Sequence, residues 1–155
     1  MRPASPEILL EALAEALETM AFVSPEPVDG QAPTPSAADC ISIRWTSKTG
    51  QPGEVQLATS CAFGEALACN ILALDPGTPE AAQRAVDALQ ELCNVTTGGL
   101  LARLCENPEE TPDMGLPSLK PLSPTEWEEF VARPQTTVIW AEGHPLAFRV
   151  EETAA

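Results

Sequence analysis

The feature that most constrains the fold is a long helical pattern that runs from Thr78 to about Glu106. Its start, Thr78-Pro79-Glu80, combines a capping hydroxyl, a proline at the first helical position and an acid near the positive end of the helix dipole. Apolar and small residues then recur at helical spacing, which predicts one buried stripe. Because Thr96-Thr-Gly-Gly99 is a poor helix-forming run, we expect a kink or a break there.

Other helices and two hairpins are predicted around this pattern. A helix begins at Ser5-Pro6-Glu7 and should end near Phe22, and further helical patterns cover 62–74 and 124–130. Alternating apolar residues predict one hairpin over 41–59 and another over 136–151. Hairpins separated by helices indicate an α/β (α+β) fold, with a mainly antiparallel sheet and long helices packed on it.

The length of 155 residues suits a single domain over 1–155. Within it, we expect loops at 24–39, which is rich in proline and small residues, and at 107–118, which is acidic. The five cysteines have no C-x-x-C spacing and there is one histidine, so neither a disulfide framework nor a metal site is predicted.

The charge is strongly acidic, with 8 Lys and Arg against 23 Asp and Glu. A formal net charge of −15 argues against binding to nucleic acid or an anionic membrane, and favours a partner with a positive docking surface. Solubility is an equally good explanation for most of the acids. Since no signal-peptide pattern and no apolar run of ~20 residues is present, we expect a cytoplasmic protein without a membrane segment.

Three polar residues on the long helix form the main candidate site. Asp87, Glu91 and Asn94 are spaced i, i+4 and i+7, which places them on one face, turned away from the stripe that contains Leu89. A carboxylate can bind a cation on a partner, and an amide can hold a water in a chosen orientation. Gly98 continues this face and would let a partner's backbone approach closely. The alternative is a polar face that is only solvated.

Other residues that can carry chemistry are predicted to be structural. His144 lies in a predicted surface turn, without the neighbours of a catalytic triad. The three tryptophans and the cysteines are expected to pack in the interior, and Cys93 should point to the buried side of the long helix.

The run Asp87-x-x-x-Glu91-x-x-Asn94, with Pro117 after 22 intervening residues, resembles the signature of the CheC/CheX chemotaxis phosphatases. The segment 95–104 also resembles the small-residue helix that follows the motif in CheX. CheC-like members carry two copies of the motif and this chain has one, so the resemblance favours CheX. Cys93 stands where the family often has glycine, a difference we expect to affect packing.

The resemblance implies removal of phosphate from the aspartyl phosphate of a CheY-like response regulator in chemotaxis. Asn94 would orient the attacking water and Glu91 would pair with the regulator's active-site lysine. Asp87 would lie at the edge of the contact, and Gly98 would let the two surfaces close. The Mg²⁺ would belong to the regulator, so no cofactor of the chain's own is implied.

The resemblance also implies a homodimer joined through the sheet. Two sets of residues are candidates for the exposed edge that such a dimer needs: Ile41, Ile43 and Trp45, or Val138 and Trp140. An alternative function is a CheX-like domain without catalysis that binds a response regulator or a flagellar-switch component.

Overall fold

The computed structural model describes residues 1–153. Its helices are α1 (Pro6–Ala21), α2 (Cys61–Leu72), α3 (Pro79–Leu104) and α4 (Pro124–Ala132), with a short 3-10 helix η1 (Pro108–Glu110). Its strands are β1 (Glu26–Pro27), β2 (Ala38–Thr46), β3 (Gly53–Ser60), β4 (Asp113–Met114), β5 (Ser118–Leu122), β6 (Thr137–Ala141) and β7 (His144–Glu152). No helix in this part of the chain is long and apolar enough to cross a bilayer.

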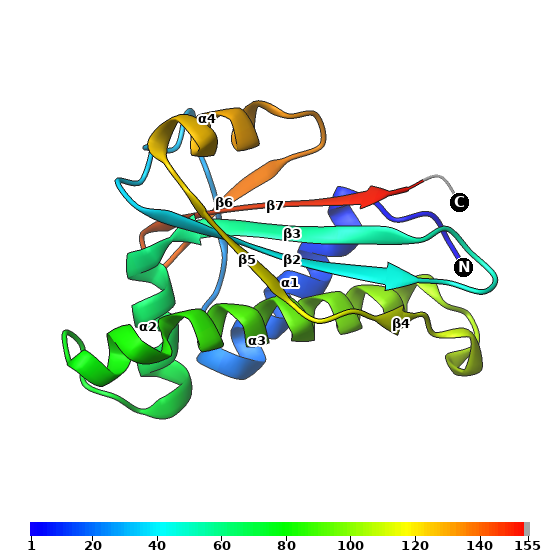
Figure 1. Ribbon diagram of the computed structural model, residues 1–155, viewed down its shortest axis with the longest axis horizontal. Coiled ribbons are helices and arrows are strands. Elements are labelled where there is room, and N and C mark those ends of the chain that lie inside the picture. The colour runs from blue at the N-terminus through cyan, green and yellow to red at the C-terminus, as the bar shows by residue number, and fades with distance from the viewer. Residues whose placement is uncertain (154–155) are drawn as a thin grey trace.

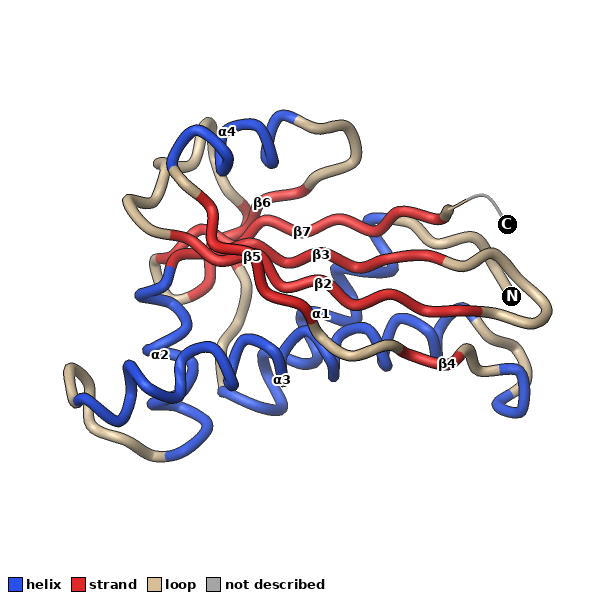
Figure 2. The backbone as a smooth tube through the Cα atoms, viewed as in Figure 1, coloured by secondary structure: helices blue, strands red, loops and turns tan. Residues whose placement is uncertain are grey.

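The strands form one antiparallel sheet in the order β1-β6-β7-β3-β2-β4, and β5 also pairs with β2. Helices α1, α2 and α3 cover one face of this sheet, and α4 lies on the other face (Figure 1). The same separation of helices from the central strands is visible in Figure 2. The predicted α+β fold with a mainly antiparallel sheet is confirmed.

Alternation along β2 sends neighbouring residues to opposite faces of the sheet. Ile41, Ile43 and Trp45 are buried in the main core beneath α1, α2 and α3. Cys40 instead belongs to a smaller core under α4. Of the two candidate edges, the one with Ile41, Ile43 and Trp45 is therefore wrong, because β2 is flanked by β3 on one side and by β4 and β5 on the other.

The predicted break in the long helix is also wrong, since α3 is continuous through Thr96-Thr-Gly-Gly99. Both threonines are fully buried, and the Thr97 hydroxyl donates to the Cys93 carbonyl at 2.7 Å. Gly99 lies against α1, where a Cβ would come within 3.5 Å of the Ala12 Cβ. Packing of this segment against α1 outweighs its low helix propensity.

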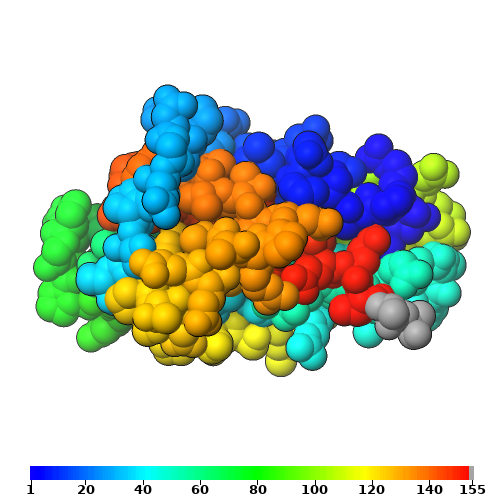
Figure 3. All heavy atoms as spheres, turned by 90° about the horizontal axis from the view of Figure 1, so that it is seen from above, coloured from blue at the N-terminus to red at the C-terminus, as the bar shows by residue number. Residues whose placement is uncertain are grey.

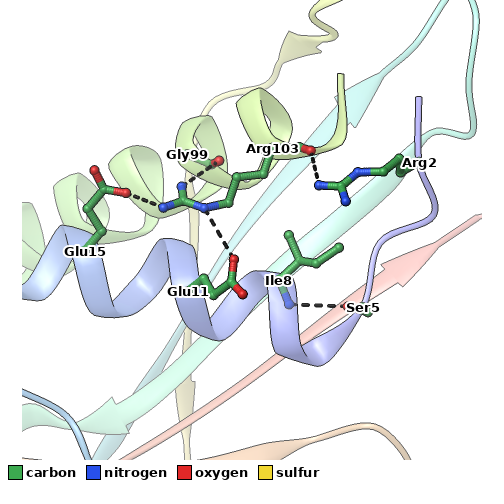
Figure 4. A network of polar contacts seen from close by, with 7 residues as sticks. All are labelled: Arg2, Ser5, Ile8, Glu11, Glu15, Gly99 and Arg103. Atoms are coloured by element: carbon green, nitrogen blue, oxygen red, sulfur yellow. Dashed lines mark hydrogen bonds and ion pairs between the residues drawn. The ribbon is translucent and has the colours of Figure 1, made fainter. Parts of the chain in front are cut away.

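An ionic network fixes the last turns of α3 on α1 (Figure 4). The Arg103 guanidinium donates to the Glu15 carboxylate, lies 3.9 Å from Glu11, and donates to the Gly99 carbonyl at 3.1 Å. Arg2 in turn donates to the Arg103 carbonyl at 2.7 Å. The helix that carries the candidate site is thus held near its C-terminal end.

The two predicted loops contain regular structure. The 24–39 segment includes β1, and β2 already begins at Ala38. The 107–118 segment includes η1 and β4, and β5 begins at Ser118. The second hairpin turns through Glu142 and Gly143, both at positive φ (49° and 77°), which suits a tight connection between twisted strands.

Candidate functional site

The candidate site lies on the face of α3 that is turned away from the core. Asp87, Glu91 and Asn94 are all exposed, and they lie on one unbroken helix. Thr78 caps the start of this helix, because its hydroxyl accepts from the Ala81 amide at 3.3 Å. The helical spacing read from the sequence therefore places the three polar side chains on one accessible face.

The opposite face of α3 positions this site by packing on the sheet and on α1 and α2. Leu89, Leu92 and Cys93 are buried there at 3% exposure or less. The Cys93 thiol lies 3.9 Å from the Ile41 carbonyl of β2, and burial raises its pKa to about 12. Cys93 is thus a neutral packing residue rather than a nucleophile.

Glu91 and Asn94 keep their side-chain polar groups available for a partner. Within residues 1–153, neither side chain forms a hydrogen bond or an ion pair. Asp87 differs, because its carboxylate lies 3.6 Å from Arg84, one turn earlier. The sequence reasoning did not single out Arg84, although its i, i+3 spacing from Asp87 could have indicated this contact.

Gly98 lies further along α3, where β4 runs beside the helix. It is half-buried, and a Cβ there would meet only the Met114 sulfur, at 3.9 Å. The chain after Met114 is fixed to β2, because the Gly115 amide donates to the Arg44 carbonyl at 2.7 Å. Gly98 is therefore more covered by its own chain than predicted, but there is still space for a partner's backbone to approach it.

Two exposed apolar residues were missed as candidates. Val95 is 36% exposed beside Asn94, and Leu116 is 91% exposed next to the half-buried Pro117. The position of Val95 outside the buried stripe was the available signal, whereas nothing in the sequence distinguished Leu116. Isolated exposed apolar residues are common, but those beside a polar site can contribute to docking.

His144 is half-buried at the first position of β7 instead of within a turn. Its Nδ1 lies 3.2 Å from the Ser60 hydroxyl. That hydroxyl also accepts from the Phe63 amide as the cap of α2, which gives the contact a structural role. In the described part of the chain, no cluster of three or more metal-ligating side chains is present.

The fold that carries this face is the CheX/CheC-like fold of chemotaxis proteins. A chemotaxis protein CheX from Desulfovibrio desulfuricans superposes with a TM-score of 0.65 at 16% identity, covering 95% of this chain and 97% of the other. CheX from Vibrio vulnificus gives 0.60 at 16% identity, over 94% and 95% of the two chains. The CheX–CheY–BeF3–Mg²⁺ complex from Borrelia burgdorferi gives 0.61 at 12% identity, over 97% and 100%. No protein-family model and no curated protein matches the sequence.

Proposed function

We propose that this protein is a phosphatase that acts on the aspartyl phosphate of a CheY-like response regulator in chemotaxis signalling. The observation that carries the proposal is the pair Glu91 and Asn94, exposed one turn apart on an unbroken helix. The similarity of the fold to a CheX seen in complex with CheY supports this choice of partner.

In the proposed mechanism, Asn94 enters the regulator's active site. Its side-chain carbonyl accepts a hydrogen bond from a water and holds that water in line with the phosphorus. The water oxygen bonds to phosphorus as the bond to the aspartyl oxygen breaks, and the electron pair leaves with the aspartate carboxylate. The water's protons pass to the phosphate and to solvent. An acyl phosphate is already reactive, so positioning is the main contribution required.

Glu91 sets the docking register by pairing with the regulator's active-site lysine. Asp87 lies at the edge of the contact, where Arg84 already shares its charge. Gly98 allows the surfaces to close. The Mg²⁺ that neutralises phosphoryl charge is held by the regulator, and the net charge of −15 steers the protein toward a basic rim on it.

We further propose that the protein acts in the cytoplasm as a homodimer joined through the β1–β6 edge of the sheet. Strand β1 pairs only with Ile139 and Trp140, so within the described residues much of β6 has no strand on that side. Sedimentation should give twice the mass of one chain, and Val138→Lys should give a monomer. A wild-type monomer at tens of micromolar would exclude the dimer without affecting the phosphatase proposal.

The decisive experiment measures the loss of phosphate from a phosphorylated CheY-like regulator with Mg²⁺. Wild-type protein should accelerate this loss, and Asn94→Ala should abolish the acceleration. The matched control is Gln83→Ala, an exposed amide on nearly the same face of α3, ~16 Å along the helix, which should act like wild type. Unchanged activity of Asn94→Ala would exclude the mechanism. Regulator binding by wild type without faster phosphate loss would instead indicate the non-catalytic alternative.

A further inference from the structure

A cavity lies on the face of the sheet opposite to the candidate site, beneath α4. It has a volume of about 230 Å³. Figure 3 looks onto this side of the molecule, where β5 and α4 (yellow and orange) cover the middle. The cavity is lined by four strands and by α4, through Cys40, Ser42, Gln56, Lys120, Leu122, Glu126, Glu129, Phe130, Arg133 and Arg149.

The antiparallel register brings the polar lining together. Ser42 of β2 is paired with Gln56 of β3, and Gln56 is paired with Arg149 of β7. Cys40, two residues before Ser42, is paired with Lys120 of β5. Residues two apart in a strand share a face of the sheet. These side chains therefore lie together on the face that forms the base of the cavity, although they come from four separate parts of the sequence.

Arg149 is unusual among the residues at the base of the cavity, because it is a charged residue with only 3% exposure. Its guanidinium lies 4.2 Å from the centre of the Phe130 ring, and its Nε donates to the Gln56 side-chain oxygen at 2.6 Å. Its Nη1 is buried and has no hydrogen-bond partner in the described residues. Leaving a buried charged donor unsatisfied is costly, so this group favours an acceptor that enters the cavity.

The charges around Arg149 leave its guanidinium incompletely neutralised. Its closest carboxylate, Glu151, lies 3.5 Å from Nε but also accepts from Arg133 at 2.9 Å. At the rim, Lys120 and Glu126 neutralise one another at 3.2 Å. Burial and the neighbouring Arg133 lower the pKa of Arg149, although an arginine stays protonated at neutral pH.

The remaining lining limits the kind of anion that fits. Leu122 and Phe130 offer apolar surface, and burial raises the pKa of Cys40, which keeps its thiol neutral. Glu126 and Glu129 also line the cavity and would repel a multiply charged ligand. The volume is below the range typical of drug-sized ligands, ~300–1,000 Å³.

We propose that this cavity binds a small monocarboxylate with a short apolar body, whose carboxylate accepts from the free end of the Arg149 guanidinium. The apolar body lies against Leu122 and Phe130. This site is separate from the α3 face, and its occupancy does not depend on the phosphatase proposal.

Titration of the ¹⁵N-labelled protein with butyrate at pH 7, followed by NMR, tests this proposal. Saturable shifts are expected at the Ser42 and Gln56 amides and at the Arg149 Nε–H. Arg149→Lys should weaken binding at least tenfold, because lysine lacks the planar fork. The matched control is Arg44→Lys, an exposed arginine further along β2 that does not line the cavity, and it should bind like wild type.

A second variant protects the test against misfolding of Arg149→Lys. Ser42→Leu fills the cavity and leaves Arg149 in place, so it should also abolish the shifts. Its cooperative thermal unfolding should show that the variant is folded. Asn94→Ala should bind butyrate normally. Unaltered binding by both cavity variants, shifts that do not saturate, or tighter binding of inorganic phosphate than of butyrate would overturn the proposal.

Discussion

Cys93 and Asn94 are adjacent on α3, yet Cys93 faces the core and Asn94 faces solvent. Cys93 is fully buried against β2, and Asn94 is exposed. The residue that packs the helix on the sheet is therefore the immediate neighbour of the residue proposed to orient water. Substitutions that disturb the packing of Cys93 against β2 should also displace Asn94. Substitution of Asn94, in contrast, should leave the core intact.

The burial of Cys93 predicts a loss of stability at high pH. Its pKa rises from 9.0 to about 12 on folding, so between these values the unfolded chain releases a proton that the native state retains. This group should therefore lower the free energy of unfolding by about 2 kcal/mol as the pH rises from 8 to 10.5. Urea unfolding across this range measures the effect.

Cys93→Ala isolates this contribution from the other titrating groups. The variant should be less stable than wild type at pH 8, because it leaves a small void, and the difference should shrink as the pH rises. A difference that stays constant up to pH 10.5 would mean that the thiol ionises as readily in the native state as in the unfolded chain.

Gly98→Ala should stabilise the protein by up to about 1 kcal/mol, because alanine is the better helix former and its Cβ meets only Met114. If a regulator backbone approaches Gly98, the same variant should bind the regulator several-fold more weakly. Gly64→Ala on α2 is the control, since its Cβ would lie 3.0 Å from Leu89 and 3.3 Å from the Ala85 carbonyl. It should gain no stability, and thermal melting distinguishes the two variants.

Arg103→Ala should destabilise the protein by about 1 kcal/mol, because it removes the network that joins α3 to α1. The loss should be smaller in 1 M NaCl, where the ionic part is screened. Arg84→Ala, which breaks one exposed pair on the same helix, should change stability by less than about 0.5 kcal/mol. Equal losses from the two variants in denaturant titrations would contradict a special role for Arg103.

Glu91→Ala should mainly weaken binding to the phosphorylated regulator, by about tenfold, since it removes a charge-assisted contact with the partner's lysine. Asp87→Ala should have a smaller effect, because Arg84 already neutralises Asp87. Calorimetric titration of each variant gives the affinities, and single-turnover rates at saturating protein show whether the chemical step is retained. A Glu91→Ala protein that binds normally but reacts slowly would place Glu91 in the chemistry rather than in docking.

The elements that could be predicted from the sequence are those whose ends are determined by residues close to them in the chain. Ser5 and Thr78 mark their helices by capping side chains, and both accept from the third following amide. The exposure of Asp87, Glu91 and Asn94 follows from helical periodicity alone, although their roles remain predictions.

Other features depend on contacts that are distant in sequence. A strand between the long helix and the 124–130 helix was expected without bounds, and β5 could not be placed more closely because four of its five residues are exposed, so it lacks the alternation of a half-buried strand. Continuity of α3 through Gly99 depends on packing against Ala12. The surroundings of Arg149 depend on the pairing of four strands, which no local pattern specifies.

The alternation of β2 has one further consequence. Ile41 and Ile43 support α3 from below, while Cys40 and Ser42 line the cavity on the far side. If β2 slipped by one residue against β3, these two pairs would exchange faces, leaving polar groups under α3 and isoleucines against Arg149. The two surfaces are chemically separate, yet a single hydrogen-bond register would create or destroy both during folding.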